Sequence, residues 1–411
     1  MLSKNAAVVL IETQSLPVAP LNWKGFPRQD RAMSVSAAPL SVAGSARDVL
    51  LGSAEGVILD GEAFGGGAAI VGAHPDRVLE GGWNDWGLLD EALEAGGRSG
   101  ADDGGLAGWF DYEGNFRFGV FPAWCRGPVE YPASSRPAVA RFHAGVTEEE
   151  WTARVRRAHE YIAAGDIYQV NLTHTLESSW DTPPGEFYPL LRGSDAPPCA
   201  AYLSLGDTAV LSASPETFLR IADGTISTRP IKGTRPRGAD AHSDQAAARE
   251  LLDSPKERAE LVMITDLLRN DIGQVCEYGS VAVPSLCRLE TFAHVHHLVS
   301  TVEGRLRPGI SPIAALRACY PGGSITGAPK KRAREIIREL ESSPRGIYTG
   351  AIGYIDWSGN AVFSIAIRTL VIRGGRATYG VGAGIVADSD PQREYEETLH
   401  KAAGLFAALG V

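Results

Sequence analysis

The alternation of hydrophobic and polar positions is clearest from residue 147 onwards. Thr147 is followed by three glutamates, and apolar residues then recur at helical spacing as far as Ile162. This pattern predicts a helix that begins with a capping box and ends at Gly165. Residues 166–173 then alternate with period two, which predicts a strand.

The predicted strand has one entirely polar face. Gln169, Asn171 and Thr173 project to one side, and Tyr168 and the apolar residues that alternate with them project to the other. Such a face can line a cleft or form the solvent-facing surface of a sheet. Periodicity alone favours the solvent-facing surface.

The remaining pattern mixes strands and helices without a regular βαβ alternation. Strands are predicted at 209–213, 218–221, 225–231, 350–356, 361–372 and 377–382, and helices at 244–270 (interrupted at Pro255), 312–319, 329–340 and 391–409. We therefore expect an α+β fold in which antiparallel-rich sheets are covered by helices, and not a doubly wound Rossmann domain.

Residues 1–140 differ from the rest of the chain in composition. They are rich in Gly, Ala and Pro with short apolar runs, which predicts short strands joined by loops and carries no motif that indicates a chemistry. We therefore expect two parts, a strand-rich N-terminal region (1–140) and a catalytic domain (141–411).

Composition and charge exclude several classes of protein. The 411 residues are 44% hydrophobic, enough for a large core, and the net charge of -10 leaves no basic surplus for general nucleic-acid binding. The apolar run at 6–11 is too short for a signal peptide or a membrane span. Five cysteines without a CxxC pair are typical of a reducing compartment. We expect a cytoplasmic protein without nucleic-acid or membrane partners.

Two predicted helices have matching acidic starts. Each begins with a capping residue, a proline and two glutamates three positions apart: Ser254-Pro255 with Glu257 and Glu260, and Asp390-Pro391 with Glu394 and Glu397. Residues three apart share a helix face, so two such pairs brought together could supply oxygen ligands to Mg²⁺. Glutamates that only complement the positive helix ends are the alternative, and the sequence does not decide between them.

A basic segment surrounds one lysine. Lys232 is flanked in sequence by Arg229, Arg235 and Arg237, and neighbouring positive charge favours the neutral, nucleophilic form of an amine. Glu216 could protonate a leaving hydroxyl. Taken alone, the segment is more typical of a basic surface loop.

Two other segments suggest ligands. Residues 322–330, GGSITGAPK, combine hydroxyls, backbone N–H groups and a helix start, which suit a carboxylate. They do not form a nucleotide phosphate loop, because Ala-Pro separates the glycine from Lys330. The HVHH run at 294–297 could bind zinc, but without further ligands at the right spacing ordinary buried or cleft histidines are favoured.

Together these segments resemble the chorismate-utilising enzymes, which include the anthranilate, aminodeoxychorismate, isochorismate and salicylate synthases. The similarity covers about residue 147 to the C-terminus, with motifs in the same order: GDIYQVNLT, ASPETF, TRPIKGTRPRG, KERAELVMITDLLRNDIG, HVHHLVSTVEG, YPGGSITGAPK, RGIYTGAIGY and GAGIVADSDPQREYEET. The resemblance implies the large fold of that family, with two packed antiparallel-rich sheets, and chorismate as the substrate.

The resemblance also implies roles for individual residues. The ring carboxylate of chorismate would lie on Mg²⁺, with Glu260 and Glu397 as direct ligands and Glu257 and Glu394 beside them. The remaining substrate contacts would be Tyr348, Arg368, Gly382 and Lys401 for the enolpyruvyl group and carboxylates, with Ser324, Thr234 and His297 completing the lining. Arg368 is expected on a strand, with a guanidinium suited to a carboxylate.

Two positions choose among the branches of the family. Members that form isochorismate or salicylate resemble this chain but carry a water-activating lysine at the place of Gln169, and a glutamine cannot act as that base. Anthranilate synthases carry P-I-A-G-T where this chain has Lys232 within P-I-K-G-T. The lysine is the mark of aminodeoxychorismate synthase component I, where it is thought to attack ring carbon 2 while the counterpart of Glu216 protonates the leaving 4-hydroxyl.

The resemblance then implies 4-amino-4-deoxychorismate as product, made from chorismate and ammonia on the way to p-aminobenzoate and folate. No G-x-C-x-G motif of a glutamine amidotransferase occurs in the sequence, so ammonia is expected from a separate glutaminase subunit. Anthranilate synthase component I, and a non-catalytic paralogue that binds chorismate or an amino acid, remain the alternatives.

Overall fold

The computed structural model describes residues 42–98, 103–137, 140–292 and 295–411. The apolar run at 6–11 and His294 of the histidine run lie outside these residues. Within them, no helix combines the length and the apolar character that a membrane crossing requires.

The described strands form two large sheets in which neighbouring strands pair antiparallel. The first sheet has the order β16 (Gly327–Ala328), β8 (Gln169–Ser179), β20 (Arg376–Ile385), β19 (Thr369–Arg373), β10 (Thr208–Ser214), β9 (Cys199–Leu205), β1 (Gly56–Leu59), β2 (Ala69–Ala73), β6 (Cys125–Gly127), with β7 (His143–Ala144) beside β8. The second has the order β13 (Ile231–Pro236), β15 (Val295–Arg305), β12 (Thr225–Thr228), β11 (Thr217–Ala222), β18 (Ala361–Ile365), β17 (Ala351–Asp356), β4 (Gly105–Phe110), β5 (Phe116–Phe121), β3 (Arg77–Gly81), with β14 (Ala282–Thr291) beside β15.

Strands from the N-terminal region extend both sheets. β1 pairs with β9 in the first sheet, and β4 pairs with β17 in the second. The described part of the first 140 residues therefore shares both sheets with the rest of the chain, and the expected division at 140/141 stays a prediction.

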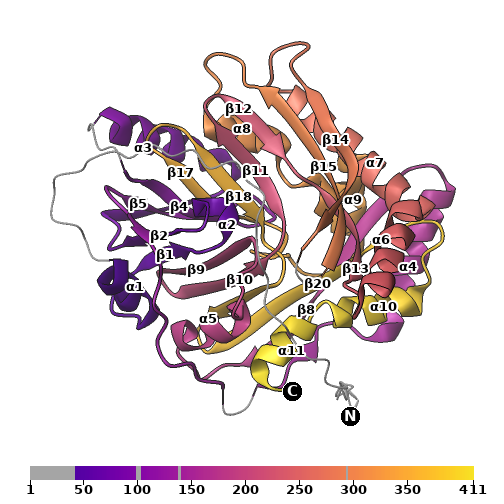
Figure 1. Cartoon of the computed structure of the whole chain (residues 1–411), viewed down its shortest axis with the longest axis horizontal. Coiled ribbons are helices and arrows are strands. Elements are labelled where there is room, and N and C mark those ends of the chain that lie inside the picture. The colour runs from indigo at the N-terminus through magenta and orange to yellow at the C-terminus, as the bar shows by residue number, and fades with distance from the viewer. Residues whose placement is uncertain (1–41, 99–102, 138–139, 293–294) are drawn as a thin grey trace.

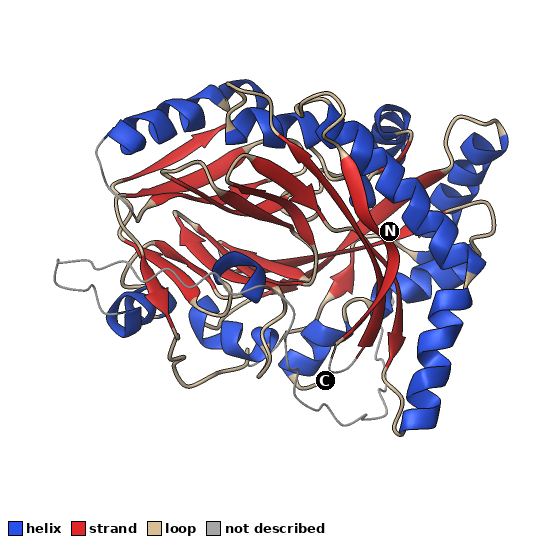
Figure 2. Ribbon diagram, turned by 45° about the horizontal axis from the view of Figure 1, so that its top comes forward, coloured by secondary structure: helices blue, strands red, loops and turns tan. Residues whose placement is uncertain are grey.

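Helices cover the outer faces of the two sheets (Figures 1 and 2). The first sheet packs on α1 (Val42–Leu50), α5 (Pro184–Arg192) and α11 (Ala403–Leu409). The second sheet packs on α3 (Gly87–Arg98), α7 (Pro255–Gly273) and α8 (Pro312–Cys319). Strands β8 and β20 of the first sheet also pack on α4 (Glu148–Ala163), α9 (Lys330–Leu340) and α10 (Pro391–His400). The short α2 (Glu62–Gly65) and α6 (Ala241–Asp253) complete the described α-helices. The predicted two-sheet α+β fold is confirmed.

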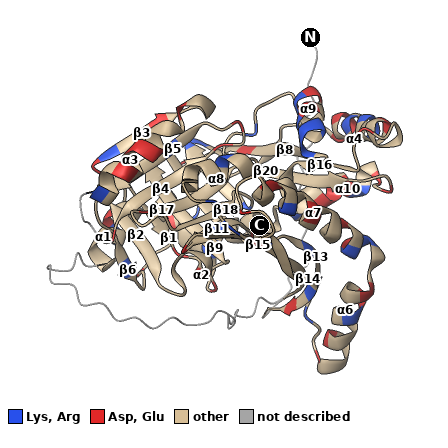
Figure 3. Cartoon of the chain, turned by 90° about the horizontal axis from the view of Figure 1, so that it is seen from above, with Lys and Arg blue, Asp and Glu red and all other residues tan. Residues whose placement is uncertain are grey.

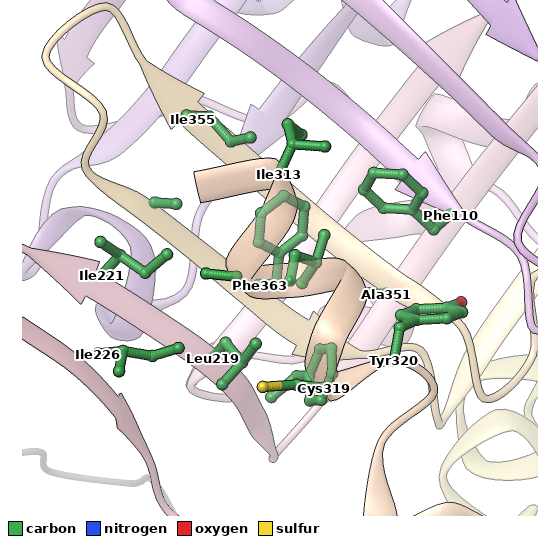
Figure 4. Close-up of a cluster of buried hydrophobic side chains, with 14 of the residues drawn as sticks. Phe110, Leu219, Ile221, Ile226, Ile313, Cys319, Tyr320, Ala351, Ile355 and Phe363 are labelled. Atoms are coloured by element: carbon green, nitrogen blue, oxygen red, sulfur yellow. The ribbon is translucent and has the colours of Figure 1, made fainter. Parts of the chain in front are cut away.

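Two apolar layers hold this arrangement together. Val57, Trp109, Leu203 and Ile352 belong to a cluster that the two sheets share. The outer face of the second sheet packs its aromatic and aliphatic side chains under α8, as Figure 4 shows around Phe363. Burial of each such side chain contributes about 1.5–3 kcal/mol. Many charged residues lie on the outer helices, among them α4, α6 and α9 (Figure 3).

Local signals in the sequence predicted most helix boundaries. Thr147 accepts a hydrogen bond from the N–H of Glu150 and completes the capping box of α4. The helical stretch at 244–270 divides at Pro255 into α6 and α7, as expected. The prediction of one continuous final helix is wrong. The segment divides into α10 and α11, because α10 packs on α4 and β20 while α11 packs on α5.

Candidate active site

A cavity of about 520 Å³ lies where β8 and β20 of the first sheet approach β13 of the second, beside the first turns of α7 and α10. Most of the predicted site residues line it: Glu216, Lys232, Thr234, Glu257, Glu260, Ser324, Tyr348, Arg368, Gly382, Glu394, Glu397 and Lys401. Gln169 and His297 do not line the cavity but bond to residues that do.

The two acidic helix starts are formed as the sequence predicted. The Ser254 hydroxyl accepts the N–H of Glu257 at 3.4 Å, and Asp390 Oδ1 accepts the N–H of Arg393 at 3.0 Å. Each cap fixes the first turn of its helix, and both turns face the same cavity. The carboxylates therefore converge from two helices.

Each of these carboxylates is held by a neighbour. Glu260 accepts bonds from Lys232 and Gln169, Glu397 contacts Lys401 at 2.7 Å, Glu394 accepts the Ser389 hydroxyl at 2.7 Å, and Glu257 lies 3.7 Å from Arg235. Within the described residues, no three Asp, Glu, His or Cys side chains gather in a group that could hold a metal ion. The oxygen donors fit Mg²⁺ in kind.

A β-bulge directs Lys232 into the cavity. The register between β13 and β15 shifts between Lys232 and Thr234, and Gly233 between them has φ +71°. A left-handed glycine is typical of such bulges, which re-aim side chains beside functional sites. The Lys232 amine then reaches Glu260 Oε1 at 2.6 Å.

The arginines near Lys232 in sequence pair with other residues. Each of the three nearby arginines has an acidic partner of its own: Arg229 pairs with Glu290, Arg235 with Glu250 and Arg237 with Asp244. The charged side chain that contacts the Lys232 amine is the carboxylate of Glu260.

Glu216 has the surroundings of a proton donor. Burial raises the pKa of its carboxyl, and although the Ser324 hydroxyl and the charge of Lys232 lower it, the pKa stays above its usual value. Ser324 Oγ donates to Glu216 Oε1 at 2.6 Å. A raised pKa favours the protonated acid that donation to a leaving hydroxyl requires.

The preference for a solvent-facing polar surface on β8 is wrong. Gln169 is completely buried and Asn171 is 9% exposed, whereas Tyr168 is 71% exposed. β16 pairs with β8 along its edge, and the turn at 323–325 lies against the polar face, where Asn171 Nδ2 donates to the carbonyl of Ser324 at 3.0 Å. Periodicity identified the polar face, but only long-range packing decides what covers it.

Gln169 is fixed by Glu260. Its Nε2 donates to Glu260 Oε1 at 2.8 Å, the oxygen that also accepts the Lys232 amine. Burial of Glu260 raises its pKa, but the charge and hydrogen bond of Lys232 and the bond from Gln169 outweigh this and leave the pKa lowered. Glu260 is therefore ionised in this arrangement.

The residues predicted to bind the substrate reach the cavity in different ways. Arg368 is not on a strand as predicted: the expected strand at 361–372 divides into β18 and β19, because Arg368 has φ +49°. Its guanidinium forms no ion pair with any described residue, so it is available to an anion. Lys401 Nζ donates to the carbonyl of Gly382 at 2.8 Å. Tyr348 lies against Gly380, where a Cβ would overlap its ring.

The two described histidines of the run at 294–297 both form hydrogen bonds within the chain. Thr234 Oγ1 lies 2.9 Å from His297 Nδ1, and burial lowers the pKa of His297 to about 4. His296 is buried and bonds to Asp244 and Thr291.

The GGSITGAPK segment serves the site through Ser324 and not through its lysine. Lys330 Nζ forms a buried ion pair with Asp271 at 2.6 Å and donates to the carbonyl of Cys319. The helix α9 begins at Lys330, after β16. Lys330 does not line the cavity.

Sequence reasoning did not single out Lys256, Thr349 and Gly384, all of which line the cavity. Lys256 stands beside Glu257 at the start of α7, so its position in the acidic motif was a usable signal. Gly384 lies opposite Asn171 across the β8–β20 pair, and a Cβ on it would overlap Gln169 Nε2. Sequence spacing does not reveal this proximity.

Comparison with known proteins gives matches over most of the chain. Residues 123–407 match the model of the chorismate binding enzyme family. The chain is 52% identical over 249 residues to aminodeoxychorismate synthase of Streptomyces griseus, which covers 60% of this chain and 34% of that protein. It is 45% identical over 294 residues to anthranilate synthase component 1 of Streptomyces coelicolor (69% and 58%), and 44% over 279 residues to aminodeoxychorismate synthase component 1 of Klebsiella aerogenes (68% and 62%). The matched segments thus span less than two thirds of these relatives.

Solved structures show the same fold. Anthranilate synthase component I from Streptococcus pneumoniae superposes with a TM-score of 0.69 at 27% identity, covering 91% of this chain and 93% of that one. A putative 2,3-dihydroxybenzoate-specific isochorismate synthase from Bacillus anthracis gives 0.75 at 20% identity, covering 89% and 99%, and at that identity it shows the fold alone. On the match over most of its length and on the convergence of the predicted residues, the chain belongs to the family of chorismate binding enzymes.

Proposed function

We propose that this protein converts chorismate and ammonia to 4-amino-4-deoxychorismate, as an aminodeoxychorismate synthase component I. The observation that carries the proposal is that Lys232 and Glu216 line the same cavity, one as an amine and the other with a raised pKa. A nucleophile and a proton donor on one cavity are the two groups that a covalent displacement of a hydroxyl requires.

The proposed chemistry has two displacements. The neutral amine of Lys232 adds to ring carbon 2, the two ring double bonds shift, and the 4-hydroxyl leaves as water with the proton of Glu216. Ammonia then adds to carbon 4, the double bonds return, and the Lys232 amine departs from carbon 2. The new ammonium group gives one proton back to the Glu216 carboxylate. The sum is chorismate plus ammonia to 4-amino-4-deoxychorismate plus water.

The other cavity residues would position the substrate. Arg368 and Lys256 both line the cavity, and neither forms an ion pair with a described residue. Of the two, the guanidinium of Arg368 suits a substrate carboxylate in a two-point contact. Lys401 and Tyr348 approach from α10 and from the 346–350 turn. Mg²⁺, held by Glu260 and Glu397 with Glu257 and Glu394 beside them, would supply positive charge to the ring carboxylate.

The partner and setting follow from the same proposal. The relatives named as component 1 suggest a second component, and ammonia would come from a separate glutaminase subunit in the cytoplasm. The product would feed p-aminobenzoate and folate synthesis.

Anthranilate synthase is the second candidate, because relatives with that name are 43–46% identical to this chain. Lys232 favours the first candidate, since a nucleophilic lysine has no task in a direct attack of ammonia on carbon 2.

The test is product identity. The protein is incubated with chorismate, Mg²⁺ and ¹⁵N-labelled ammonium, and the products are separated and weighed by mass spectrometry. The proposal expects labelled 4-amino-4-deoxychorismate that retains the enolpyruvyl group. Labelled anthranilate with free pyruvate would establish the second candidate, and tight chorismate binding without turnover would establish a binding paralogue.

A further inference from the structure

Arg345 is a buried cation that joins four segments around the cavity without lining it. Its side chain is 2% exposed and that of Glu341 is 6% exposed. Nε and Nη2 donate to the two oxygens of Glu341, each at 2.8 Å. The guanidinium also lies over the ring of Tyr112, 4.3 Å from its centroid. A two-point pair of this kind fixes the orientation of the guanidinium plane.

The remaining donors of Arg345 hold two backbone carbonyls beside the reactive groups. Nη1 donates to the carbonyl of Ile325 at 2.9 Å, and Nη2 to the carbonyl of Asn171 at 2.7 Å. Glu341, held by Arg345, accepts the N–H of Thr173 at 2.9 Å. Arg345 therefore fixes the turn at 323–325 relative to strand β8.

That turn presents Ser324 to the acid. Ser324 precedes Ile325, its carbonyl accepts Asn171 Nδ2 at 3.0 Å, and its hydroxyl donates to Glu216 at 2.6 Å. Arg345 thus contacts the backbone on both sides of the Asn171–Ser324 contact. A shift of the turn would move Ser324 and lengthen the hydrogen bond from its hydroxyl to Glu216. Arg345 bonds to the neighbouring backbone and not to Ser324 itself.

We propose that Arg345 is a positioning residue of this site, which sets the proton donor by holding the turn at 323–325 so that the Ser324 hydroxyl meets Glu216. The proposal rests on the proposed function, in which Glu216 is the acid. Arg345 does not itself line the cavity or contact a reacting atom, so its effect on Glu216 is transmitted through Ser324.

The expected signature is a change in how Glu216 titrates. The Ser324 hydrogen bond lowers the pKa of Glu216 against the larger effect of burial, so its loss raises that pKa further. The other groups that face Glu216 are Lys232 and the thiol of Cys199, and neither bonds to Arg345. Because the acid acts in its protonated form, activity falls as pH rises through this pKa. When the pKa of Glu216 rises, the falling limb of the plot of activity against pH therefore moves to higher pH.

The experiment is a double-mutant cycle on Arg345→Lys and Ser324→Ala, read from the pH dependence of the ammonium-supported reaction. Both single variants are expected to move the falling limb upward, and Arg345→Lys to lower kcat roughly 10- to 100-fold with less change in KM. The double variant should shift the limb no further than Ser324→Ala alone, because both changes remove the same bond. Independent, additive shifts or an unmoved limb in Arg345→Lys would overturn the proposal.

Two further measurements keep the result interpretable. Arg192→Lys is the matched control: Arg192 also pairs with a partly buried carboxylate, Asp60, but lies outside the cavity, so it should lower the melting temperature and leave the limb in place. If Arg345→Lys does not fold, Glu341→Gln replaces it and should move the limb in the same direction. Titration of the Glu216 carboxyl by ¹³C NMR needs no turnover. A shift there in a protein that forms no product would support the positioning role while removing the proposed reaction.

Discussion

The amine of Lys232 lies 2.6 Å from Glu260 Oε1, and each side chain is 18% exposed. The residue proposed as nucleophile thus rests on the residue proposed as metal ligand, and Gln169 donates to the same oxygen at 2.8 Å. A partly buried ion pair is stable only while both partners are present. Substitutions at either position therefore test the site as a unit.

Lys232→Met is expected to remove the reaction. The methionine keeps much of the shape and cannot form a bond to carbon 2, so the rate of 4-amino-4-deoxychorismate formation should fall roughly 1000-fold or more. Lys232→Arg serves as the control for charge, since it keeps a cation for Glu260 and should be equally inactive. Either variant within tenfold of the wild type would exclude a covalent role for Lys232.

Glu216→Gln should lower the activity and raise the stability of the protein at neutral pH. Loss of the acid should lower kcat roughly 100- to 10,000-fold. Because the folded-state pKa of Glu216 is raised above 4.5, its contribution to stability is full below pH 4.5 and is lost as pH rises through the folded pKa. The variant should therefore melt above the wild type at neutral pH, with a difference that shrinks towards pH 4.5. A lower melting temperature at neutral pH would contradict the burial argument.

Glu260→Gln and Glu397→Gln should weaken Mg²⁺ binding. Calorimetric titration of Mg²⁺ into each variant without substrate should show affinity reduced roughly 10- to 100-fold, because each change removes an anionic oxygen donor. Glu277→Gln is the matched control, since Glu277 is 44% exposed and does not line the cavity. Equal Mg²⁺ affinity in the wild type and all three variants would contradict the metal site and leave the glutamates of the two helix starts with a capping role only.

Gly384→Ala should disturb the cavity through Gln169. An added Cβ would overlap Gln169 Nε2 and lie 3.0 Å from Asn171 Oδ1, and Gln169 is completely buried and has little room to move. Overpacking of this kind costs about 1–3 kcal/mol, and kcat/KM should fall at least tenfold as the bond to Glu260 is lost. Gly404→Ala in α11, with nothing within 4 Å of its Cβ, should instead stabilise the fold by about 0.5–1 kcal/mol and leave kcat/KM unchanged. Equal effects of the two changes would contradict the account.

Interactions within a few residues could be predicted from the sequence. The Thr147 capping box and the Ser254-Pro255 helix start depend on contacts three or four positions apart, and both are present. The long motifs placed Lys232, Glu216 and the four glutamates in one site, and the cavity gathers them. Their chemical roles stay predictions.

Contacts between distant segments could not be predicted. The polar face of β8 is covered by a turn more than 150 positions away, and the partner of Lys232 is a carboxylate 28 positions away and not the arginines beside it in sequence. The break at Arg368 rests on one left-handed residue that strand alternation does not signal. Arg345 stood inside a recognised motif, yet its bonds to Asn171 and Ile325 emerge only from the packing of β8 against the turn.

Covalent trapping tests the central claim most directly. The protein is mixed with chorismate and Mg²⁺ in the absence of ammonia, quenched, digested and analysed by peptide mass spectrometry. The account predicts that the peptide containing Lys232 gains the mass of chorismate less one water, and that added ammonium discharges this adduct as 4-amino-4-deoxychorismate. An unmodified Lys232 peptide from protein that still forms the product on addition of ammonium would contradict it.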